Sequence, residues 1–203
     1  HIPKANPRTQ AILNNRSVEI LIHQGKLSEA ENILKAPITG TDPFIAAINR
    51  MTEGFLYLNQ GRNDRALEAL TSAVHDLQEL ENGLETALAL SYLGQVYVAT
   101  GKYVQAETQL QMALSIRREK LEGTSELIAA SYNDLGFACT QVDVDRALDY
   151  YEQAAAIYEK LHGKDHRKMA IANTNLGIAN LGLQFYGDAT NHFEAALAIW
   201  EKI

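Results

Sequence analysis

The 203-residue sequence contains one cysteine, four prolines and no long hydrophobic run. The single cysteine, Cys139, cannot form an internal disulfide, and its position in a helical pattern favours a small buried residue over a nucleophile. No stretch approaches the roughly 18 consecutive apolar residues of a membrane span, and the first residues lack the apolar core of a signal peptide. The sequence therefore predicts no membrane insertion, and we expect a cytoplasmic protein; the alternative is a protein from which a signal peptide has been removed.

Basic residues are in the minority. Lys and Arg number 18 against 25 Asp and Glu, which gives a formal charge of −7, and no basic stripe is present that could follow a phosphate backbone. Nucleic acid is therefore disfavoured as a partner. Apolar residues make up 46% of the chain, enough to bury a core. Because no Pro/Gly/Ser-rich segment divides the sequence, we expect a single unit.

The sequence repeats itself at a nearly constant interval. Five copies share an alanine in their second half, and these alanines are almost evenly spaced: Ala30, Ala66, Ala106, Ala147 and Ala189. In three copies a glycine precedes that alanine at an identical offset (Gly54, Gly94 and Gly177), and in another copy at a slightly shorter one (Gly136). Such recurrence at fixed offsets is typical of a repeat architecture.

This pattern resembles the tetratricopeptide family, whose two-helix unit carries Leu-Gly, then a Gly-x-aromatic-x-x-Ala turn, then a later Ala. Leu93-Gly94 and Gly101-Lys102-Tyr103 are the clearest matches. The copies are longer than the family's usual unit of about 34 residues. Gly163-Lys164-Asp165-His166 is similar to the linker of the longer kinesin-light-chain-like and bacterial subclass, although Arg167 stands where that linker has Pro.

The resemblance implies an all-α fold, a right-handed solenoid of about five antiparallel helix-turn-helix hairpins. We place the repeats at about residues 9–38, 43–81, 84–122, 125–162 and 167–203. Since the sequence has no initiator Met and stops within a helical pattern, we expect it to be a piece of a longer protein.

Apolar residues in the second helices recur in steps of three, four and seven, which predicts one buried stripe along each helix. Gly25, Gly61 and Gly101 are expected to end first helices in the left-handed conformation, and Asp64, Asp145 and Asp188 to cap the helices that follow. The fourth copy lacks such a glycine, so we expect an irregular turn at residues 142–145. Pro37 should keep the second helix of the first copy short.

In the family the first helix of each hairpin lines a concave groove, so the resemblance implies that a bound segment contacts first-helix residues. The corresponding positions here include Met51, Phe55, Asn59, Tyr92, Gln95, Asn133, Asp134, Phe137, Gln141, Thr174 and Asn175. Side-chain amides can bond the N–H and C=O groups of an extended peptide, and Met51, Phe55, Tyr92 and Phe137 would supply apolar pockets. The alternative for Tyr92, and for Ile178 at another such position, is packing within the hairpin. The groove positions of the second to fourth copies include no Lys or Arg, which disfavours a clamp for an acidic chaperone tail.

Candidate chemistry is sparse. His162 and His166 have a spacing that could join two imidazoles to one metal on a helix. Gly163 argues against a helix there, however, and no third ligand is near in sequence. A phosphate-binding loop is absent, and acidic clusters such as Glu79-Leu80-Glu81 lie at expected helix ends. We therefore expect no metal, no cofactor and no catalysis.

Three functional hypotheses remain. The first is a scaffold or adaptor that holds a peptide or helix of another protein in the groove. The second is a sensory or autoinhibitory arm of a larger regulator, such as a transcription factor or signalling ATPase. The third is a self-assembling array joined through the apolar end that carries Trp200 and Ile203.

Overall fold

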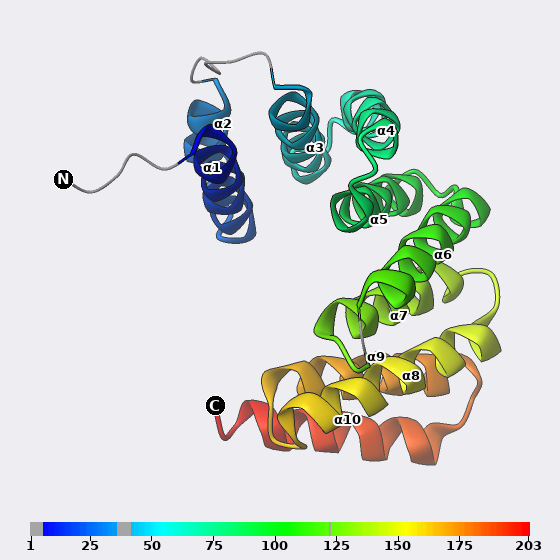
Figure 1. Cartoon of the computed structure of the whole chain (residues 1–203). Helices are drawn as coiled ribbons and strands as arrows, with labels where there is room; N and C mark the ends of the chain where they lie inside the picture. Colours follow the sequence, from blue (N-terminus) through cyan, green and yellow to red (C-terminus); the bar gives the residue numbers. More distant parts are fainter. Residues whose placement is uncertain (1–5, 36–41, 122) are drawn as a thin grey trace. The chain divides into compact units, whose positions relative to one another are not determined.

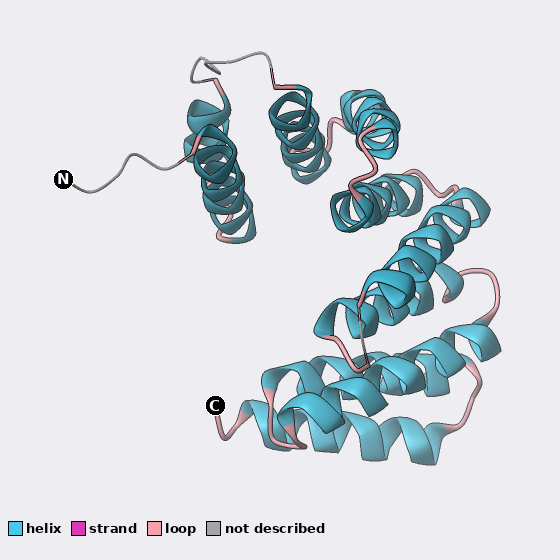
Figure 2. Ribbon diagram, in the orientation of Figure 1, coloured by secondary structure: helices cyan, strands magenta, loops and turns pink. Residues whose placement is uncertain are grey.

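The computed structural model describes residues 6–35, 42–121 and 123–203, and every regular element in those ranges is an α-helix (Figures 1 and 2). The chain forms two compact units, residues 1–100 and 101–203. Unit 1 contains α1 (Pro7–His23), α2 (Leu27–Leu34), α3 (Pro43–Asn59), α4 (Asn63–Glu79) and α5 (Gly83–Ala99). Unit 2 contains α6 (Tyr103–Lys120), α7 (Glu126–Cys139), α8 (Val144–His162), α9 (Arg167–Gly182) and α10 (Tyr186–Trp200).

Consecutive helices pack as hairpins: α1 on α2 and α3 on α4 in unit 1, and α7 on α8 and α9 on α10 in unit 2. Glycines at the crossing points permit the close approach. A methyl group at Gly136 would lie 2.6 Å from Tyr151 Cε1, and one at Gly177 would lie 2.6 Å from Phe193 Cε1. Because both distances are far below van der Waals contact, any larger residue would push the paired helices apart or displace the ring.

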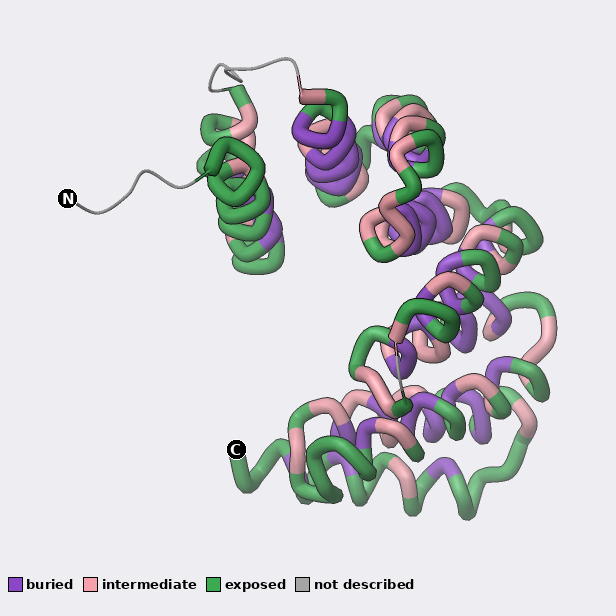
Figure 3. The backbone as a smooth tube through the Cα atoms, in the orientation of Figure 1, coloured by how far each residue is buried: buried purple, intermediate pink, exposed green. Residues whose placement is uncertain are grey.

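Hairpins also stack on one another within each unit. The second helix of one hairpin packs against the first helix of the next, at the α4/α5 seam in unit 1 and at the α6/α7 and α8/α9 seams in unit 2. One cluster of buried residues in unit 2 contains Tyr151 and Tyr158 of α8 together with Leu176 and small alanines of α9. In contrast, α1 and α10 are largely exposed (Figure 3).

The turn predictions are partly confirmed. Gly25, Gly61 and Gly101 adopt the left-handed conformation, with φ of 74°, 72° and 72°. In the irregular fourth turn, the Asp143 side chain accepts a bond from the Arg146 N–H and caps α8. The expected caps Asp64, Asp145 and Asp188 lie instead inside the first turns of α4, α8 and α10. There the carboxylates favour the helix through its positive N-terminal end.

The first hairpin is the shortest. Helix α2 has eight residues, as expected for a second helix cut short by Pro37, although residue 37 itself lies outside the described residues. Because α2 is short, it covers only part of α3, and a cleft opens between the two helices.

Candidate protein-binding surface

The predicted groove residues of unit 1 are mostly buried. Met51 and Phe55 of α3 and Tyr92 of α5 are buried side chains. The rings of Phe55 and Tyr92 stack with centroids 4.1 Å apart and an interplanar angle of 13°, and His23 of α1 lies 5.5 Å from Phe55. Of the other predicted residues, Gln95 is half-buried and Asn59 is exposed.

Polar side chains also connect α1 to α5 beside these rings. The Tyr92 hydroxyl donates to Glu19 Oε1 of α1 at 3.2 Å, and Arg16 Nη1 donates to Glu19 Oε2 at 2.7 Å. The bond with Glu19 raises the pKa of Arg16, so the guanidinium remains charged. Since α1, α3 and α5 are joined by their own side chains, Met51, Phe55 and Tyr92 offer little surface to a partner. In this conformation the three side chains pack within unit 1, and their role in binding a partner segment stays a prediction.

Unit 2 presents its first helices differently. Asn175 Nδ2 of α9 donates to Asn133 Oδ1 of α7 at 2.6 Å, so two predicted groove residues, 42 positions apart in sequence, are brought together. Thr174 is half-buried, and its hydroxyl donates to the Ala170 carbonyl of its own helix. We call this surface the α7/α9 face; its members are Asn133, Asp134, Phe137, Gln141, Thr174, Asn175 and Ile178.

Two apolar side chains of the α7/α9 face are open to solvent. Phe137 of α7 is 61% exposed and Ile178 of α9 is 46% exposed. Each lies one position after the repeat glycine, Gly136 or Gly177, so they occupy equivalent places on the two first helices. Gln141 is also exposed. The face thus combines apolar side chains, which can contact apolar side chains of a bound segment, with amides, which can hydrogen-bond to its backbone.

The charge of Asp134, a member of this face, acts on two buried tyrosines of α8. Burial, together with the charges of Asp134 and Glu126, raises the pKa of Tyr158 to about 12. Burial likewise raises the pKa of Tyr151, whose hydroxyl lies 3.2 Å from Thr140 Oγ1. Both phenols therefore stay neutral beneath the face at physiological pH. Asp134 is the half-buried carboxylate among its members.

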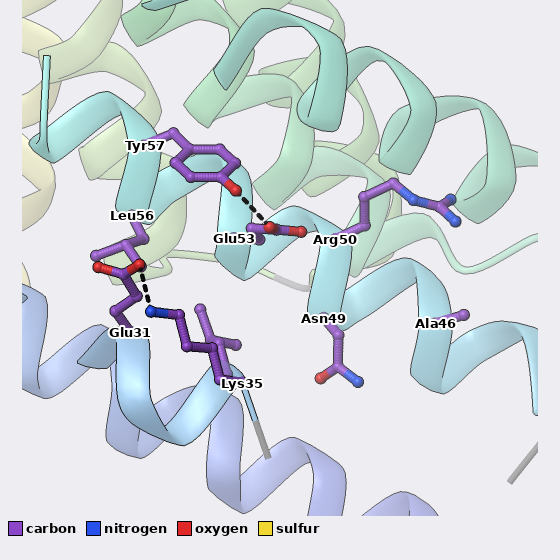
Figure 4. A pocket seen from close by; sticks show the side chains of 9 residues that line it. Glu31, Lys35, Ala46, Asn49, Arg50, Glu53, Leu56 and Tyr57 are labelled. Carbon is purple, nitrogen blue, oxygen red and sulfur yellow. Dashed lines mark hydrogen bonds and ion pairs between the residues drawn. The ribbon is translucent and has the colours of Figure 1, made fainter. Parts of the chain in front are cut away.

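The cleft between α2 and α3 was not predicted. It has a volume of about 300 Å³, and Figure 4 shows the side chains that line it. Its lining residues are Glu31, Leu34, Lys35, Ala46, Asn49, Arg50, Glu53, Leu56 and Tyr57. One residue of the sequence indicates this cleft. Glu53 occupies the repeat position at which later copies have the buried Leu93, Leu135 and Leu176.

The charged groups of the cleft are already paired with each other or with neighbours. Lys35 Nζ lies 2.9 Å from Glu31 Oε1, and the Tyr57 hydroxyl donates to Glu53 Oε1 at 2.6 Å. The hydrogen bond with Glu53 raises the pKa of the Tyr57 hydroxyl. Arg50 forms an ion pair with Asp76. The lining therefore favours no particular ligand charge.

His162 and His166, the two candidate metal ligands, lie where α8 ends and α9 begins. Helix α8 ends at His162, and His166 Nδ1 accepts the Lys168 N–H at 3.2 Å as the cap of α9. The two rings stack with centroids 4.2 Å apart. Within the described ranges, no cluster of three His, Cys, Asp or Glu residues could hold a metal ion. Cys139 is buried, and burial raises the pKa of its thiol, which disfavours the reactive thiolate.

Stacked hairpins with alanine and glycine at their crossings define a helical-repeat solenoid of the all-α class. The family model of the tetratricopeptide repeat matches residues 44–119, 85–160 and 127–202. The chain belongs to the tetratricopeptide-repeat family, and its longer repeats are of the kinesin-light-chain-like type. None of the described helices combines the length and apolar character needed to cross a bilayer.

The match to the curated relatives covers only part of each relative's length. Protein KINESIN LIGHT CHAIN-RELATED 2 of Arabidopsis thaliana is 27% identical over 154 residues, which are 73% of this chain and 23% of that protein. RxLR effector protein SFI4 of Phytophthora infestans is 31% identical over 148 residues, 71% of this chain and 43% of that protein. The chain therefore spans less than half of these relatives.

Solved structures share the fold. BtubC (BKLC) from P. vanneervenii has a TM-score of 0.76 at 21% identity, with 98% of this chain and 92% of that chain covered. A Rap protein solved in complex with Competence and Sporulation Factor has a TM-score of 0.76 at 19% identity, with 98% and 56% covered. These neighbours show the fold, and family membership supports a protein–protein interaction scaffold.

Proposed function

We propose that the α7/α9 face holds a segment of a partner protein, so that the chain acts as a non-catalytic scaffold or adaptor. The observation that carries this proposal is the exposure of Phe137 and Ile178 at equivalent positions beside the Asn133–Asn175 pair. Exposed aromatic and aliphatic side chains next to amides provide both pockets and backbone bonds for a bound segment.

The side-chain amides of Asn133 and Asn175 can still form hydrogen bonds with a ligand. Their mutual bond uses one N–H of Asn175 and one lone pair of Asn133. A side-chain amide has two N–H donors and two acceptor lone pairs. The remaining Asn133 donors can meet a peptide carbonyl, and the Asn175 carbonyl can meet a peptide N–H. Phe137 and Ile178 then receive apolar side chains of the same segment.

A peptide library panned on the wild-type chain tests the proposal. Selected peptides should share a motif, and their affinity should fall at least about tenfold on Phe137→Ser, the loss of one well-buried aromatic contact. The matched control is Val104→Ser, which removes an exposed apolar side chain from α6 outside the face. Affinity equal on both variants, or no enriched motif, would count against the α7/α9 face.

The regulatory-arm hypothesis stays a prediction. A signal transduction ATPase from Pyrococcus horikoshii with a tetratricopeptide-repeat sensor has a TM-score of 0.67, and this chain covers 28% of it. If the full-length gene encodes an effector domain, deletion of residues 1–203 should change that domain's activity. Unchanged activity would remove the hypothesis.

A further inference from the structure

Helices α3 and α5 of unit 1 correspond to helices α7 and α9 of unit 2, because each pair consists of two successive first helices. The residue directly after the repeat glycine is Phe55 on α3 and Phe137 on α7. On the next first helix, the residue two positions before the repeat glycine is Tyr92 on α5 and Asn175 on α9. Phe55 and Tyr92 are therefore the repeat equivalents of Phe137 and Asn175.

The two equivalent phenylalanines differ in exposure. Phe137 is 61% exposed, whereas Phe55 is 4% exposed. The Tyr92 ring stacks on Phe55 with centroids 4.1 Å apart, and the His23 ring adds a tilted contact at 5.5 Å. At the position of Tyr92, unit 2 has the short amide Asn175. An aromatic ring at this repeat position thus covers the neighbouring phenylalanine, and an amide leaves it open.

The hydroxyl of Tyr92 contacts the same repeat position on a second helix. Glu19 lies 11 residues before the repeat alanine Ala30, as Phe55 lies 11 residues before Ala66. The Tyr92 hydroxyl donates to Glu19 Oε1 at 3.2 Å, and Glu19 is 8% exposed. One side chain therefore contacts equivalent positions on α1 and α3, through its hydroxyl and its ring.

We propose that Tyr92 is an internal occupant of a second binding surface, which unit 1 carries on α3 and keeps closed. The inference rests on the proposed function, in which a partner segment places an apolar side chain on Phe137. The equivalent contact on Phe55 is already made by Tyr92. A segment can reach Phe55 only after the ring leaves, which breaks the stack and the bond to Glu19.

This closure lowers the affinity of unit 1 for a segment. The apparent affinity of a site is reduced by the fraction of molecules in which the site is open. The Phe55 stack and the hydrogen bond to Glu19 both favour the closed arrangement. The wild-type chain should therefore bind one segment, at the α7/α9 face, and removal of the Tyr92 ring should raise the number to two.

Isothermal titration calorimetry on variants provides the test. Phe137→Ser disables the α7/α9 face and serves as the background. Tyr92→Asn then gives unit 1 the residue that unit 2 has at the equivalent position. A segment selected on the wild type should lose binding to Phe137→Ser and regain it on Phe137→Ser/Tyr92→Asn. Adding Phe55→Ser should abolish the regained binding.

Two further variants control for folding and for unspecific effects. Tyr97→Asn makes the same change at a half-buried tyrosine of α5 outside the ring stack, and it should restore no binding. Circular dichroism verifies folding. If Tyr92→Asn unfolds the chain, Tyr92→Leu opens Phe55 while it keeps an apolar side chain at the position.

Peptide panning on the opened Phe137→Ser/Tyr92→Asn variant, or on its Tyr92→Leu counterpart, separates this inference from the proposed function. Selected segments that depend on Phe55 would support the closed surface even if no segment depends on Phe137. If Phe137-dependent segments exist and no segment from either panning binds the opened variant through Phe55, the inference fails alone. A wild-type chain that already binds a second segment through Phe55 would also overturn it, because unit 1 would then be open.

Discussion

At the scale of single residues, two glycines determine how closely paired helices approach each other. Gly136 lies against the ring of Tyr151, which is buried and bonded to Thr140, whereas Gly177 lies against Phe193, which is partly exposed. Replacing Gly by Ala in a helix gains about 1 kcal/mol of intrinsic stability, and overpacking a fixed core costs about 1–3 kcal/mol. The balance depends on whether the facing ring can move.

We therefore expect Gly136→Ala to lower the free energy of unfolding by about 1 kcal/mol and Gly177→Ala to leave it nearly unchanged. Urea denaturation of the two variants measures the difference. Equal effects would show that the two rings are equally free to shift.

A second residue-scale prediction concerns pH. Lys168 Nζ lies 3.1 Å from Glu126 Oε1, and this bond, with the charge of His162, lowers the pKa of Glu126. A carboxylate with a lower pKa in the folded state contributes stability above its unfolded pKa, and that contribution is lost as pH falls through the folded value. Because Glu126 is largely exposed, the contribution should be about 0.5 kcal/mol or less.

Glu126→Gln should accordingly destabilise the chain slightly at pH 7 and have no effect at about pH 3. Denaturation midpoints of wild type and variant at both pH values measure it. Only the difference between the two proteins counts, because Glu31 and Asp42 also have lowered pKa values. A difference that persists at low pH would assign Glu126 a role other than charge pairing.

At the scale of elements, the α6/α7 seam depends on a buried arginine. Arg117 donates to Ser131 Oγ and, at 3.4 Å, to the Leu127 carbonyl. We expect Arg117→Ala to lower the free energy of unfolding by about 3 kcal/mol, through lost packing and a lost charged hydrogen bond. Ser131→Ala should cost about 1 kcal/mol. A double-mutant cycle should give a coupling above about 0.5 kcal/mol, and additive effects would contradict the contact.

The elements were the most predictable part of the molecule. Helix pairing, the left-handed turn glycines and the short α2 follow from local offsets and from residues with one strong backbone preference. The helix caps were less predictable. Asp145 and Asp143 are close neighbours in sequence, and which of them caps α8 depends on where the helix begins. A small shift of that start exchanges a capping side chain for one inside the first turn.

The candidate site was less predictable, for a reason that Tyr92 illustrates. Family offsets place it on the groove wall, but its hydroxyl reaches Glu19, 73 residues earlier in the sequence. Local spacing does not encode that contact, so burial of the unit 1 positions could not be read from the repeat. Asn133 and Asn175 lie at adjacent repeat positions of neighbouring copies, and their hydrogen bond shows that these two positions lie together.

At the scale of the whole molecule, the repeat accounts for the fold, and the proposed function rests on the exposure of particular repeat positions. At Phe137 and Ile178, exposure recurs in both first helices of unit 2 that carry the α7/α9 face, and this is the surface at which we propose that a partner binds.

The most direct test of the central claim is an amide chemical-shift titration of the ¹⁵N-labelled chain with a peptide selected by panning. Binding at the α7/α9 face predicts that the largest shifts cluster around Phe137, Asn175 and Ile178, and that Phe137→Ser abolishes them. Shifts centred on the α2/α3 cleft or on α10 instead would contradict the assignment of partner binding to the α7/α9 face.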